Sequence, residues 1–167
     1  METSPFASGR LSISVLTDTP VYTMLSRQDP NYGAVLCQIL KCSGRRELEE
    51  LGTGRFEVDG FTFLLTKYCS QGPSWRFTIR AAHIEELTHY ELSSLFAESL
   101  LVLNCGNSDF CALRYEEWSA VLDTENPPPQ QTITLRRPKN CGFSVSGSGG
   151  ELERKIPVQR FHKLFAG

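Results

Sequence analysis

The sequence predicts an α+β protein: a mainly antiparallel sheet built from hairpins, with three to five helices packed mostly on one face. Several short segments alternate apolar and polar side chains, as strands with one buried face require. Tight-turn sequences join neighbouring strand segments, which favours antiparallel pairing. Apolar residues also recur at helical spacing after helix-start signals, so helices and hairpins share one chain.

Length and composition indicate one globular domain. The chain has 167 residues, of which 40% are hydrophobic and 22% are charged, values typical of a single soluble domain. Residues 1–9 are rich in Ser, Pro and Gly and predict a flexible lead, so the globular domain is expected over residues 10–167. Residues 126–131 predict an exposed, proline-rich connection.

The first third of the chain predicts two strands and then two helices. Alternation over residues 11–15 predicts a strand, and residues 21–25 predict a second one. Asp29 and Pro30 form a helix-start signal. Residues 45–51 predict a short second helix. The first helix is expected to bury the apolar residues that follow its start at helical spacing: Tyr32, Val35, Leu36, Ile39 and Leu40.

The clearest hairpin is expected around Asp59 and Gly60. Asp-Gly suits a two-residue type I′ turn, because both central positions need a positive φ. Such a turn predicts two apolar cross-strand pairs on one face: Phe56 with Phe63, and Val58 with Phe61.

The middle of the chain predicts a strand over residues 75–80 and a helix over residues 88–99. Thr88 and Glu91 match a capping box at the start of that helix. The strand is expected to point Trp75, Phe77 and Ile79 inward and Arg76, Thr78 and Arg80 outward. The helix is expected to bury Leu92, Leu95 and Phe96.

The last part of the chain predicts a hairpin, a short helix, three short strands and a tail that is helical or turn-like. The hairpin joins residues 100–105 to residues 110–114, and the tail covers residues 157–165. The short helix carries Trp118, Val121 and Leu122. The three strands are marked by Ile133 and Leu135, by Phe143 and Val145, and by Leu152 and Ile156.

The same sequence predicts a cytoplasmic protein that does not cross a membrane. An acid at position 2 and the absence of a long apolar run argue against a secretory signal. The longest apolar stretch, residues 100–103, is far shorter than the ~20 residues that a membrane helix needs. The six cysteines are expected to be reduced, and no close pair of them predicts a metal or other cofactor.

One enzymatic hypothesis is a small metal-dependent hydrolase or nuclease whose site is assembled from distant residues. Such a site needs carboxylates to hold Mg²⁺ and a lysine near the attacking water. The usual pattern of these enzymes has an acid two residues before the lysine, but Leu65 stands two residues before Lys67. Asp59 is already explained as a residue of the expected hairpin turn. The candidate residues for this alternative are Glu57, Asp59, Lys67 and Glu116.

Three weaker catalytic patterns have simpler structural explanations. Cys105 continues an apolar strand and is expected to be buried rather than nucleophilic. The glycine-rich residues 144–150 lack the Gly-Lys-Ser/Thr of a phosphate loop and predict a hairpin loop. Glu116 and Glu117 are the acids that the first turn of a helix favours.

Charge is segregated along the chain. Residues 131–167 carry seven basic and two acidic side chains, whereas residues 1–130 carry ten basic and seventeen acidic ones. The first hypothesis is therefore a non-enzymatic binding or accessory subunit, whose basic carboxy-terminal surface contacts an acidic protein or a nucleic-acid backbone. The expected binding residues are Arg136, Arg137, Lys139, Arg154, Lys155, Arg160 and Lys163, which Arg76 and Arg80 could extend.

Two other interpretations stay open at this point. The basic segment could instead pack beside the acidic body of its own chain. A purely structural subunit would show an exposed apolar patch above a few hundred Å².

Overall fold

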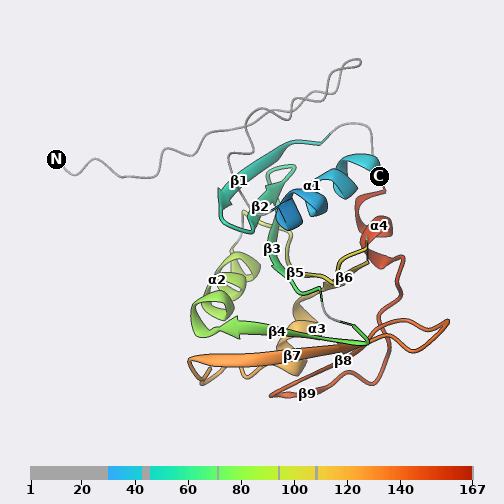
Figure 1. Cartoon of the computed structure of the whole chain (residues 1–167). Helices are drawn as coiled ribbons and strands as arrows, with labels where there is room; N and C mark the ends of the chain where they lie inside the picture. Colours follow the sequence, from blue (N-terminus) through green and yellow to red (C-terminus); the bar gives the residue numbers. More distant parts are fainter. Residues whose placement is uncertain (1–29, 43–45, 71, 94, 108, 167) are drawn as a thin grey trace.

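A computed structural model describes residues 30–42, 46–70, 72–93, 95–107 and 109–166, which form four helices and nine strands in an α+β arrangement (Figure 1). The large sheet has the order β1-β2-β3-β5-β6. Its strands are β1 (Leu48–Gly52), β2 (Arg55–Val58), β3 (Thr62–Tyr68), β5 (Glu98–Asn104) and β6 (Phe110–Leu113). The small sheet contains, in spatial order, β4 (Ser74–Arg80), β7 (Gln130–Arg136), β8 (Ser144–Gly147) and β9 (Gly150–Glu151). The helices are α1 (Pro30–Cys42), α2 (Ala81–Leu92), α3 (Tyr115–Val121) and α4 (Arg160–Phe165).

The elements stack in four layers (Figure 1). Helices α1 and α4 cover one face of the large sheet, and α2 and α3 lie between its other face and the small sheet. The core cluster under α1 and α4 includes Val35, Ile39, Leu64, Val102 and Phe161. The core cluster between the sheets includes Leu65, Leu101, Trp118, Ile133 and Val145.

The α+β class and the mainly antiparallel pairing are as predicted, but the strands divide between two sheets. Helices cover both faces of the large sheet, because β3 and β5 pair in parallel and carry nearly continuous apolar runs. Strands of that kind must be buried on both sides. The structure therefore has a second apolar layer that a single hairpin sheet would not need.

Several predicted elements are confirmed. Helix α1 begins at Pro30 and buries Val35, Leu36 and Ile39. The β5–β6 hairpin pairs Leu103 with Cys111. Strand β4, helix α3 and helix α4 also form where their patterns predict them. The strands predicted over residues 11–25 and the lead over residues 1–9 lie outside the described residues.

The helix predicted over residues 45–51 is wrong. Residues Leu48–Gly52 form β1, which pairs with β2 and buries Leu48 opposite Val58. A segment this short fits either periodicity, so pairing with a neighbouring strand decides its conformation.

The second predicted helix forms in a different place. Helix α2 begins directly after β4, so Thr88 lies inside it rather than at its start, and it ends at Leu92 instead of near position 99. The side chains of Leu92 and Leu95 are 75% and 77% exposed rather than buried. The cap at its start comes from His83, whose Nδ1 accepts the backbone N–H of Arg80 at 3.1 Å.

The predicted hairpin forms, but its register is shifted by one residue. Val58 pairs with Thr62 and Phe56 pairs with Leu64, so the loop has three residues instead of two. Asp59 and Gly60 do have the predicted positive φ, at 53° and 77°. A shift of one residue reverses the faces of β3, because successive side chains alternate. Leu64 consequently packs under α1, while Phe63 joins the cluster between the sheets.

The proline-rich connection is shorter than predicted. Strand β7 begins at Gln130, and the buried Gln131 side chain bonds the backbone N–H and carbonyl of Asp123. In the described part of the chain, no helix has both the length and the apolar character that crossing a membrane demands.

Candidate functional site

The outer face of the small sheet carries polar and basic side chains along β4, β7 and β8, and the exposed Glu151 on the edge strand β9, opposite Ser146, adds one acid to it. Along β4, β7 and β8 the inward positions are apolar or Gln131, whereas the outward positions alternate with them and are exposed or half-buried. The register sets Arg76 opposite Thr134 and sets Arg136 between Ser74 and Ser144. No helix of the described residues covers this face (Figure 1). Its outward side chains in the two longest strands and β8 are Ser74, Arg76, Thr78, Arg80, Gln130, Thr132, Thr134, Arg136, Ser144 and Ser146.

Further basic residues lie at the end of the small sheet where β7 leads into β8. Phe143 pairs with Ile156, which brings the chain around residues 154–155 beside this end. The Cβ of Lys155 lies 3.4 Å from where a β-carbon on Gly142 would stand. We define the basic face by the exposed Arg76 and Arg136 on the sheet together with the exposed cations beside this end of it: Lys139, Arg154 and Lys155.

Two predicted binding residues are instead paired with acids of the chain's own body. Arg137 forms an ion pair with Asp109 at 2.7 Å and lies over the Phe143 ring. Arg160 forms an ion pair with Glu117. For these two arginines, the interpretation that the basic segment packs against its own acidic body is correct.

Lys163 lies apart from the basic face. It is exposed on α4, which covers the side of the large sheet that faces away from the small sheet. Lys163 and the equally exposed Lys41 on α1 therefore sit on the opposite side of the four-layer stack.

The structure does not bring the four residues of the hydrolase hypothesis together. Asp59 lies in the β2–β3 turn, where it pairs with Arg46 and accepts the backbone N–H of Glu47. Glu116 is exposed at the start of α3, after β6 at the other edge of the large sheet. Within the described residues, no group of three or more His, Cys, Asp or Glu side chains could hold a metal ion.

Cys105 is unsuited to act as a nucleophile. Burial, with smaller contributions from Asp109 and Cys69, raises the pKa of its thiol to about 12. Burial raises the pKa of the Cys111 thiol as well. A nucleophilic cysteine needs the thiolate, which these surroundings disfavour.

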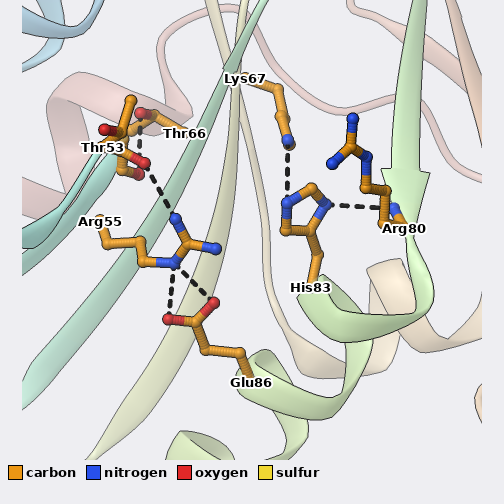
Figure 2. A network of polar contacts seen from close by, with 8 residues as sticks. Thr53, Arg55, Thr66, Lys67, Arg80, His83 and Glu86 are labelled. Atoms are coloured by element: carbon orange, nitrogen blue, oxygen red, sulfur yellow. Dashed lines mark hydrogen bonds and ion pairs between the residues drawn. The ribbon is translucent and has the colours of Figure 1, made fainter. Parts of the chain in front are cut away.

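Glu57 and Lys67 do share one face of the large sheet, and Lys67 belongs to a polar cluster with α2 (Figure 2). The Lys67 Nζ lies 3.2 Å from the Nε2 of His83. Arg55 on β2 donates from its Nε to both carboxylate oxygens of Glu86, each at 2.7 Å. Figure 2 shows the Arg80 side chain turned toward the Lys67 amine, so Arg80 is not counted with the basic face.

The hydrogen bonds assign the protons of the Lys67–His83 pair. His83 Nδ1 accepts the Arg80 backbone N–H, so the single N–H of a neutral imidazole must be on Nε2. That N–H points at the Lys67 Nζ, which can accept it only as an unprotonated amine. In this arrangement a neutral Lys67 amine can accept the His83 Nε2–H, whereas a protonated amine would set two donors against each other.

The pKa of each group is shifted in the direction that favours its neutral form. Burial, followed by the charges of Arg55 and Arg80, lowers the pKa of Lys67 to about 8. Burial, followed by the charge of Lys67 and those of the two arginines, lowers the pKa of His83 to about 4. Desolvation and like charges both disfavour a protonated base, so the two causes act in the same direction.

Lys67 was a predictable candidate, whereas its partners on α2 and β2 were not. A lysine in the otherwise apolar run of β3 was the available signal. His83 gave no signal of its own, because the start of α2 was expected seven residues later. Comparisons with protein-family models, curated proteins and solved structures found no match to this chain.

Proposed function

We propose that this protein is a non-enzymatic binding or accessory subunit that contacts the phosphate backbone of a nucleic acid through its basic face. The observation that carries the proposal is a sheet face with guanidinium and hydroxyl groups and no apolar side chain along β4, β7 and β8. A cytoplasmic location, predicted from the sequence, belongs to the same proposal.

The composition of the face favours phosphate over an acidic protein surface. Protein interfaces are enriched in aromatic residues at their buried centre, and the outward positions of β4, β7 and β8 have none. Phosphate oxygens, in contrast, accept hydrogen bonds from Arg, Lys, Ser and Thr. Arg76 and Arg136 are diagonal neighbours across β4 and β7, a spacing of about 7–8 Å. Two guanidinium groups so placed can contact separate phosphates of one strand.

Binding of this kind depends on salt more than on base sequence. About five phosphate contacts predict that affinity falls several hundredfold between 50 and 200 mM salt. The dissociation constant at physiological salt is expected on the order of 10⁻⁴–10⁻⁶ M. Base contacts are not required, because backbone contacts position a protein without reading sequence.

Fluorescence anisotropy with labelled single-stranded and duplex oligonucleotides of two unrelated sequences tests the proposal. The Arg76→Gln/Arg136→Gln variant should bind at least tenfold more weakly than the wild type at 50 mM salt. The Lys41→Gln/Lys163→Gln variant removes the same charge from the opposite side of the molecule, and should bind nearly as well as the wild type.

Two results would contradict the proposal. Equal losses in the two double variants would mean that net charge, not the basic face, is responsible for binding. Absence of binding to every oligonucleotide at 50 mM salt would exclude a nucleic-acid backbone and leave an acidic protein as the candidate partner.

A further inference from the structure

The Lys67 amine lies near His83, Arg55 and Arg80, and it forms no ion pair with an acid in the described part of the chain. Its one hydrogen bond there is to His83. Glu86, the acid whose charge acts on it, is already bound through both oxygens to Arg55. The groups around the amine come from β2, the end of β4 and α2: Arg55, Arg80, His83 and Glu86.

This arrangement suits an anionic group beside the Lys67 nitrogen better than a cation. The Nε2–H of His83 points at that position, and the guanidinium of Arg80 is turned toward it (Figure 2). Hydrogen bonds from a guanidinium to an anionic oxygen are among the stronger ones in proteins. A group that converts the amine into an anion would therefore lie close to these donors.

We propose that Lys67 is a site of reversible carbamate formation with carbon dioxide. The lone pair of the neutral Nζ attacks the carbon of CO₂, an N–C bond forms, and one C=O π pair moves onto oxygen. The nitrogen then releases one proton to water. The amine and CO₂ thus yield a carbamate anion and one proton, with no oxidant, reductant or further reactant.

The charge of the product favours CO₂ over an aldehyde or ketone. A Schiff base forms from the same neutral amine, but its protonated form is a cation that Arg55 and Arg80 would destabilise. The carbamate is an anion that the same two arginines and the His83 N–H would stabilise. Lys67 is also only half-buried as a residue, and CO₂ is among the smallest carbonyl-type reactants.

The wild-type protein in ¹³C-bicarbonate buffer at pH 8 provides the direct test. A carbamate signal is expected in the ¹³C NMR spectrum. Treatment with triethyloxonium, which ethylates carbamates, should place a stable ethoxycarbonyl group on Lys67, located by peptide mass mapping. The other lysines, Lys41, Lys139, Lys155 and Lys163, are exposed and serve as internal controls.

The amino terminus of the chain can also form a carbamate, so two variants are needed to assign the ¹³C carbamate signal to Lys67. Lys67→Arg should remove the Lys67 component, and the matched Lys163→Arg variant should retain it. Arg80→Gln should reduce the occupancy of the carbamate several-fold. If Lys67→Arg does not fold, the peptide map of the wild type decides alone.

The proposal fails if ethoxycarbonyl labelling of Lys67 does not exceed that of the four exposed lysines. It also fails if pyridoxal phosphate and borohydride label Lys67 selectively while bicarbonate does not, because the amine would then react with carbonyl compounds and not with CO₂.

Discussion

His83 connects two elements through its two ring nitrogens. Its Nδ1 accepts the backbone N–H of Arg80 at the start of α2, and its Nε2 faces Lys67 on β3. Because the capping bond uses Nδ1 as its acceptor, the N–H of a neutral His83 is on Nε2. That N–H faces the Lys67 amine, which can accept it only when the amine is neutral. A local helix cap thereby orients the ring nitrogen that faces a side chain on another element.

Lys67 should make the folded state less stable at neutral pH than at alkaline pH. Its pKa is about 8 in the folded protein and about 10.4 in an unfolded chain. The unfolded state therefore binds more protons between these values, so this group raises the free energy of unfolding as pH increases from 8 to 10.4. Below pH 8 the folded state carries a poorly solvated cation.

The Lys67→Met variant should accordingly be more stable than the wild type at pH 7, by about 1 kcal/mol once solvent screening is allowed for. That advantage should shrink as the pH approaches 10. Urea unfolding at several pH values measures this difference in stability. Lys163→Met, which removes an exposed lysine and leaves Lys67 in place, is the control. A constant difference across this range would mean that the pKa of Lys67 is not lowered.

At the scale of elements, two glycines differ in the space that a β-carbon would have. Gly33 lies within α1, and a β-carbon on it would meet nothing within 4 Å. Gly147 ends β8 against the end of α3, where a β-carbon would stand 2.2 Å from the carbonyl oxygen of Val121. The first is a helix position that alanine suits better, while the second lets a strand and a helix touch.

Substitution of both glycines by alanine should therefore change stability in opposite directions. Gly33→Ala should raise the free energy of unfolding by about 0.5–1 kcal/mol. Gly147→Ala should lower it by at least about 2 kcal/mol, because the clash is with backbone and cannot be relieved by a side-chain rotation. Thermal and urea unfolding of the two variants beside the wild type measure both effects. A neutral Gly147→Ala would show that α3 and β8 are not in close contact.

The sequence pattern predicts those elements in which buried positions recur at regular spacing along the segment. Alternation over residues 75–80 and helical spacing from Pro30 each report a single buried face, so β4 and α1 follow directly. The register of the β2–β3 hairpin could not be predicted from its turn. It follows from the parallel partner β5, which needs Leu64 and Phe63 on opposite layers.

The site was predictable to a similar extent. Alternation predicts that Arg76 and Arg136 face outward. The ion pairs of Arg137 with Asp109 and of Arg160 with Glu117 could not be predicted, because these partners come together only in the folded chain.

At the scale of the whole molecule, the two core clusters lie on opposite faces of one sheet and share its strands. Phe161 on α4 belongs to the cluster under α1, and Trp118 belongs to the cluster between the sheets. The second tryptophan of the chain, Trp75, also packs against the cluster between the sheets. Tryptophan fluorescence therefore reports on the cluster between the sheets, whereas a substitution of Phe161 perturbs the cluster under α1 and α4.

Because the strands are common to both clusters, we expect the described fold to unfold in one cooperative step. Phe161→Ala should lower the free energy of unfolding by about 3–5 kcal/mol, the usual cost of truncating a buried phenylalanine. Urea unfolding followed by tryptophan fluorescence and by far-ultraviolet circular dichroism should show the same shifted midpoint with both probes. Leu92→Ala, at a 75% exposed position, is the control that should leave the midpoint nearly unchanged. A Phe161→Ala transition that moves in circular dichroism but not in fluorescence would instead mean that the layer of α1 and α4 unfolds independently of the layer between the sheets.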